Sequence, residues 1–124
     1  MSALWQKLAD LIAAGGVRIS EHGYDALADD GLTIDEVLSS VPRAVVIEEY
    51  PDRPKGSAAL VLQLDAEGKP VHAVWGIPRG YNRPAVLVTA YKPDPALWDS
   101  TFTRRGVHDR KKEDQADPRR PICS

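Results

Sequence analysis

Hydrophobic residues recur at helical spacing in the first part of the chain and gather in short, nearly continuous runs further on. Leucine and isoleucine return every three or four residues from Leu4 to Ile12, which predicts an amphipathic helix over about residues 2–14. Gly15-Gly16 ends this helix, because glycine is common just past a helix C-terminus. Residues 17–19 are then expected to form a short extended link.

Capping residues predict two further short helices. Ser20 is a good N-cap for the second helix, which should end before Gly31. Thr33 and Glu36 have the spacing of a capping box, in which each side chain accepts a hydrogen bond from a backbone N–H of the other residue. The third helix should therefore begin after Thr33 and end near Ser40, just before a proline.

Four β-strands are expected after these helices, at residues 44–50, 58–64, 71–76 and 85–91. Short turns join the last three strands, so they should form an antiparallel meander. Helices followed by such a sheet predict an α+β fold, a two-layer domain with N-terminal helices packed on a mainly antiparallel four-stranded sheet.

The 124 residues are enough for one domain, which we expect to span residues 1–103. Residues 104–124 carry seven Lys or Arg against four acids, a net +3, whereas residues 1–103 carry nine against fourteen, a net −5. This segment is interpreted as a charged, solvated C-terminal tail, although it would also suit an acidic partner. The N-terminal residues show an amphipathic pattern that is not typical of a signal peptide, and no apolar run reaches about 20 residues, so we expect a cytoplasmic protein without a membrane partner.

Several short motifs, in their order and spacing, resemble the bacterial domain-of-unknown-function family 4258. They are Arg18-Ile-Ser-Glu-His22, the stretches 31–37, 47–51 and 68–74, and the closing stretch 88–94 with Trp98. The resemblance covers about residues 17–100, while the loop 77–84 is longer than the family's usual turn. The family is similar in layout to RelE/ParE-type toxins, including BrnT and MqsR-like ribonucleases. The resemblance therefore implies a compact toxin-like fold, cleavage of mRNA free or on the ribosome, and an antitoxin partner.

Two histidines are candidate catalytic residues for metal-independent RNA cleavage. Such cleavage needs a base for the 2′-OH proton, an acid for the leaving oxygen and cations for the phosphate, and histidine transfers protons near neutral pH. His22 opens the second helix, and His72 lies within the third strand on the same face as Val74. The family motif includes both positions, which makes His22 and His72 candidates for an acid–base pair if their rings reach a common phosphate. The alternative is that each ring has a structural, hydrogen-bonding role.

Cationic and aromatic residues that suit RNA phosphates and bases lie mainly in two loops. We expect both loops at one end of the sheet, because two strands separate them; the alternative is that they are simply solvated. The candidate substrate-binding residues are Arg53, Lys55, Arg79, Tyr81, Arg83, Tyr91 and Lys92. The carboxylates are scattered and no phosphate-binding glycine loop is present, so neither a metal nor a cofactor is expected.

These observations predict a toxin-like component of a bacterial toxin–antitoxin system, a metal-independent endoribonuclease acting on mRNA. Two alternatives involve no catalysis. One is a protein-interaction module that docks a partner through an exposed sheet edge or through the Trp5 face of the N-terminal helix, which could also join a second copy as a homodimer. The other is a ParE-like inhibitor of a protein target.

Overall fold

The computed structural model describes residues 2–94, and its helices and strands all lie in the unit Met1–Lys92, after which the chain divides. The predicted tail, residues 104–124, and Trp98 lie outside the described residues. In chain order the elements are α1 (Ala3–Ala13), β1 (Val17–Ile19), α2 (Glu21–Asp29), α3 (Ile34–Ser39), the 3-10 turn η1 (Val41–Arg43), β2 (Val45–Tyr50), β3 (Ala58–Leu64), β4 (Pro70–Gly76) and β5 (Ala85–Tyr91).

Side-chain caps start all three α-helices. The Ser2 hydroxyl accepts a hydrogen bond from the Trp5 N–H at the start of α1, and the Ser20 hydroxyl accepts one from the Gly23 N–H at the start of α2. The predicted capping box of Thr33 and Glu36 is present at the start of α3. Local sequence signals therefore set the beginnings of these helices.

The sheet has five strands in the order β1-β5-β4-β3-β2, one more than the sequence predicted. Strands β2 to β5 pair antiparallel, whereas β1 pairs parallel with β5, with Val17 opposite Ala85. Residues 17–19 were expected to be only a link. They form a strand because the Ala85 N–H donates to Gly16 and the Ser20 N–H donates to the Leu87 carbonyl, contacts that depend on chain folding.

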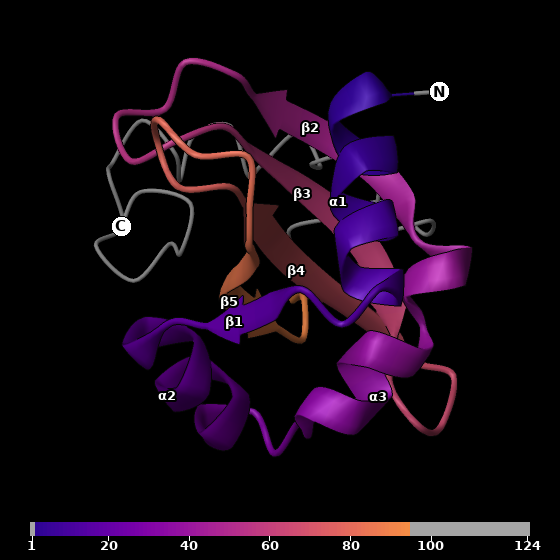
Figure 1. Cartoon of the computed structure of the whole chain (residues 1–124). Helices are drawn as coiled ribbons and strands as arrows, with labels where there is room; N and C mark the ends of the chain where they lie inside the picture. Colours follow the sequence, from indigo (N-terminus) through magenta and orange to yellow (C-terminus); the bar gives the residue numbers. More distant parts are fainter. Residues whose placement is uncertain (1, 95–124) are drawn as a thin grey trace, which may run out of the picture. The chain divides into compact units, whose positions relative to one another are not determined.

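The hydrophobic core lies between the helices and one face of this sheet, and α1 crosses in front of β3 in Figure 1. Trp5 and Leu8 of α1 are buried there together with Trp75 of β4 and Leu87 of β5. The mixed α+β class is thus confirmed. The Trp5 side of α1, which could have served a partner, is packed within its own chain.

A buried polar network joins α3 and η1 to the sheet. The Trp75 Nε1–H donates to the Gln63 side-chain oxygen at 2.8 Å, and the Gln63 amide nitrogen donates to the Ser40 hydroxyl at 2.9 Å and to the Val37 carbonyl at 2.5 Å. Gln63, Ser40 and Trp75 are all fully or almost fully buried. Each polar group is satisfied by another, which offsets the cost of removing it from water.

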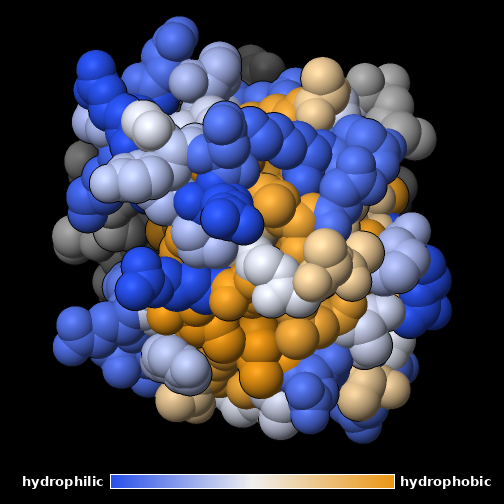
Figure 2. Space-filling view, viewed as in Figure 1, coloured by the Kyte–Doolittle hydropathy of each residue, from blue (hydrophilic) through white to orange (hydrophobic). Residues whose placement is uncertain are grey.

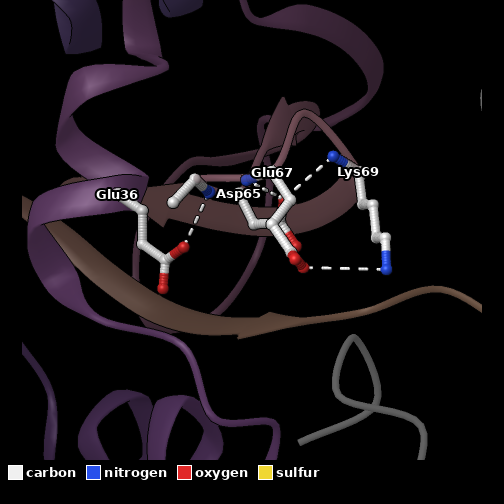
Figure 3. Close-up of polar contacts among 5 residues, drawn as sticks. Glu36, Asp65, Glu67 and Lys69 are labelled. Carbon is white, nitrogen blue, oxygen red and sulfur yellow. Dashed lines mark hydrogen bonds and ion pairs between the residues drawn. The ribbon is translucent and has the colours of Figure 1, made fainter.

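Two carboxylates stabilise the β3–β4 turn at the end of the sheet shown in Figure 3. Glu36 accepts hydrogen bonds from the Ala66 and Thr33 N–H groups at 2.7 and 2.8 Å, and these hold its pKa below the usual value. Asp65 accepts hydrogen bonds from the backbone N–H groups of Lys69 and Glu67, and the Lys69 bond is the main cause of its lowered pKa.

No helix within residues 2–94 is long and apolar enough to cross a membrane.

Candidate functional site: a cationic pocket between two loops

The loops before β3 and before β5 lie side by side at one end of the sheet (Figure 1). Their proximity follows from the register of β3 and β4, in which Ala58 is opposite Gly76. The pairing continues beyond the strands, because the Ile77 N–H donates to the Ser57 carbonyl at 2.9 Å and the Arg79 N–H donates to the Lys55 carbonyl at 3.0 Å. The two loops are therefore held together by backbone hydrogen bonds.

Gly56 makes this close approach possible. Its φ of +128° is a conformation that residues with a side chain rarely adopt. A Cβ atom at this position would overlap the Ile77 carbonyl oxygen and lie 2.7 Å from the Arg79 nitrogen. Only glycine fits between the loops as they stand.

The loops and the N-terminal half of α1 surround a pocket of about 490 Å³. Hydrophilic residues gather over this region in Figure 2. The pocket lining combines charged side chains with prolines, glycines and aliphatic residues. It consists of Leu4, Lys7, Pro51, Asp52, Arg53, Gly56, Ser57, Ile77, Pro78, Arg79, Gly80 and Tyr81. We call this hollow the cationic pocket.

The charged residues of the cationic pocket are Lys7, Arg53, Arg79 and Asp52, which gives a formal charge of three minus one, or +2. The Arg53 guanidinium donates to the Gly56 carbonyl at 3.3 Å, and the Lys7 ammonium donates to the Asn82 side-chain oxygen at 3.2 Å. Both partners are neutral. An ion pair between Lys69 and Glu67 lies away from the pocket, in the β3–β4 turn at the opposite end of the sheet.

Tyr81 is the aromatic residue of the cationic pocket, and 71% of its surface is exposed. It follows Gly80, whose φ of +83° turns the loop just before it. In a pocket with a net positive charge, an exposed aromatic ring can stack on a nucleic-acid base while cations contact phosphate. The site can therefore bind an anion that carries a flat, apolar group.

The structure brings together only some of the predicted substrate-binding residues. Arg53, Arg79 and Tyr81 line the cationic pocket. Lys55 and Arg83 are exposed in the same two loops but do not line it. The remaining two, Tyr91 and Lys92, lie at the other end of β5, where the Lys92 N–H donates to the Asp30 carboxylate at 2.7 Å.

The two candidate catalytic histidines occupy different environments. His72 is fully buried, and it points to the face opposite the helices because its neighbours Val71 and Ala73 belong to the core. Its Nδ1 lies 3.4 Å from the Tyr91 hydroxyl, and the two rings meet edge to face with centroids 5.4 Å apart. His22 is exposed in the first turn of α2.

Neither histidine lines the cationic pocket. His72 is four residues before Gly76, the residue of β4 at the pocket end of the sheet, which is roughly 13 Å along an extended strand. The pairing of His22 with His72 remains a prediction. The structure does show His72 in contact with Tyr91.

Asp52 and Lys7 line the pocket but were not among the predicted site residues, and Lys7 is the cation of the two. It lies on a helix that was interpreted only through its apolar side, and nothing in the pattern separates it from other exposed polar residues of α1. Its place in the pocket depends on how α1 packs over the sheet.

Within residues 2–94, no group of three or more His, Cys, Asp or Glu side chains could hold a metal ion.

Comparisons with known proteins identify a family but no characterised relative. Neither the curated proteins nor the solved structures include a match to this chain. The family described as "Domain of unknown function (DUF4258)" matches residues 19–92, which is 74 of the 124 residues and takes in the chain from the end of β1 to the end of β5. Because the match covers more than half of the sequence, the chain belongs to the DUF4258 family.

Proposed function

We propose that this protein binds RNA through the cationic pocket and acts as the toxin-like, RNA-cleaving component of a bacterial toxin–antitoxin pair. The observation that supports the proposal is that Lys7, Arg53 and Arg79 line one pocket together with the exposed residue Tyr81. Uncompensated cations attract the RNA backbone, and an aromatic ring stacks on bases of any sequence.

Cleavage requires a proton-transfer group within about 2.6–3.2 Å of the reacting atoms. Tyr81 lines the pocket, and a tyrosine hydroxyl is a group that can donate a proton during cleavage. His22 and His72 remain the predicted acid–base pair. A direct role for His72 would require its buried ring to become accessible to RNA.

The RNA-binding part of the proposal is tested by the fluorescence anisotropy of a labelled single-stranded RNA, titrated at several salt concentrations. Arg53→Ala and Arg79→Ala should each weaken binding about tenfold and reduce the salt slope, because each removes a charged contact. The matched control is Lys69→Ala, which removes an equal charge at the opposite end of the sheet. Equal affinities for all four proteins would refute the assignment of the pocket.

The cleavage part is tested by induced expression in a bacterial host, with total RNA examined in parallel. Growth arrest with RNA cleavage by the wild type, lost in Tyr81→Phe, would assign the chemistry to the pocket. Loss in His72→Gln, with a folded protein and RNA affinity retained, would instead assign it to the histidine. Arrest without RNA cleavage in every case would favour the ParE-like inhibitor.

One observation favours the non-catalytic interaction module as a second candidate. An apolar hollow of about 480 Å³ lies between α1 and the segment formed by α3 and η1, with Ile12, Val17, Leu38 and Val41 among its lining residues. Apolar residues are visible on this side of the molecule in Figure 2. An antitoxin or a second copy that docks here should be released by Leu38→Glu, measured by pull-down or by solution mass.

A further inference from the structure

We infer that the cationic pocket binds a terminal phosphate group, of a nucleotide or of an RNA end, in preference to the internal phosphodiesters of an RNA strand. The inference builds on the proposed RNA binding and adds the class of group that is bound. The volume of about 490 Å³ lies within the range of about 300–1,000 Å³ found for small-ligand sites. A hollow of this size suits one nucleotide.

The charge of the cationic pocket matches a phosphomonoester. Such a group carries about −1.5 to −2 at pH 7, because its second proton dissociates near pH 6. An internal phosphodiester carries a single negative charge. The formal charge of +2 from Lys7, Arg53 and Arg79 against Asp52 is therefore balanced by a terminal phosphate and only half balanced by a diester.

The cations come from three separate segments of the chain. Arg53 belongs to the loop before β3, Arg79 to the loop before β5, and Lys7 to α1. A guanidinium group can donate two parallel hydrogen bonds to two phosphate oxygens, and an ammonium group supplies a compact point charge. A terminal phosphate has three free oxygens, whereas an internal diester has two. A terminal phosphate can therefore offer one free oxygen to each of the three cations, whereas an internal diester cannot.

The other side chains of the pocket suit the rest of a nucleotide. The exposed ring of Tyr81 offers a stacking surface for the base. The Asp52 carboxylate can accept a hydrogen bond from a ribose hydroxyl or a base amine, and it disfavours a second phosphate in the same space. These two residues explain why a nucleotide would be preferred to free phosphate.

Lys7 is the residue that we expect to decide this preference. It lies outside the family match at residues 19–92, so α1 adds a cation to two loops that belong to the family region. Lys7 is exposed, and its ammonium contacts only the neutral Asn82 side chain among the described hydrogen bonds. Replacing Lys7 should therefore leave the fold intact.

The test compares three short single-stranded RNAs of one sequence, with a 5′-phosphate, a 3′-phosphate or hydroxyls at both ends, as competitors of a labelled strand. One phosphorylated form should bind at least about tenfold more tightly than the hydroxyl form, and the two arms show which end is recognised. Lys7→Ala should reduce this preference to about twofold or less, and Lys7→Arg should retain it. Thermal melting of each variant verifies folding.

Two results separate this inference from the proposed function. Equal affinity for all three RNAs, weakened equally by Arg53→Ala, would overturn the terminal-phosphate inference and leave RNA binding in place. Binding of a nucleoside monophosphate without binding of any RNA strand would support the inference and overturn the RNA function. Failure of every ligand to bind would overturn both.

Discussion

Replacing Gly56 by alanine should destabilise the protein and weaken RNA binding together, because this glycine holds the two pocket loops in contact. A side chain at a positive φ costs about 1–2 kcal/mol. The new Cβ would also overlap the Ile77 carbonyl, so the loops must separate. Separation strains the Ile77–Ser57 and Arg79–Lys55 backbone hydrogen bonds, each worth about 0.5–1.5 kcal/mol. The expected loss is about 2–5 kcal/mol.

The matched control is Gly68→Ala, in the turn at the other end of the sheet. Gly68 also has a positive φ, +80°, but a Cβ there meets nothing within 4 Å, so only the conformational cost of about 1–2 kcal/mol applies. Urea unfolding of both variants gives the difference in stability, and RNA anisotropy gives the effect on the pocket. If Gly56→Ala unfolds like Gly68→Ala, or is folded and binds RNA as the wild type does, the assigned role of Gly56 is refuted.

Three further predictions follow from contacts away from the pocket. Gln63→Leu should cost about 1–3 kcal/mol in urea unfolding, because it leaves the buried Trp75 N–H without an acceptor, and it should cost less in a Trp75→Phe background, which has no N–H to leave unpaired. The lowered pKa of Glu36 means that its contribution to stability is present above the ordinary value of 4.5 and is lost as the pH falls through the lower folded value. Glu36→Gln should therefore flatten the decline in melting temperature below pH 4.5, and an unchanged decline would contradict this. Ser20→Ala should cost about 0.5–2 kcal/mol by removing the N-cap of α2, measured by urea unfolding, with the exposed Ser39→Ala as its control.

The helices and four of the strands could be predicted because their signals are local. Ser20 and the Thr33–Glu36 box determine helix starts through bonds made within one turn, and the apolar run of β3 is apparent without knowledge of its neighbours. Strand β1 could not be predicted in this way. Three residues are too few to show a period, and they become a strand only when β5 is positioned beside them.

The candidate site was predictable to the extent that it depends on strand connections. Arg53 lies in the loop between β2 and β3, and Arg79 lies in the loop between β4 and β5. In an antiparallel meander these two loops fall at the same end of the sheet, so strand order alone favours their proximity. The burial of an individual side chain could not be predicted in the same way. His72 is apparent as a polar residue in an apolar strand, but its burial beside Tyr91 depends on packing of the sheet face, which an alternating pattern does not report.

Helix α1 links the stability of the fold to the composition of the pocket, and this determines how the site can be studied. Trp5 and Leu8 on one side of α1 fill the core, where a truncation such as Leu8→Ala costs about 2–5 kcal/mol. Lys7, next to Leu8 in sequence, lies on the pocket side. Deleting the helix would therefore remove a pocket cation and part of the core at once, and lost RNA binding would have two causes. Substitution of exposed Lys7 separates them, since it changes the charge of the pocket from +2 to +1 while Trp5 and Leu8 stay in place.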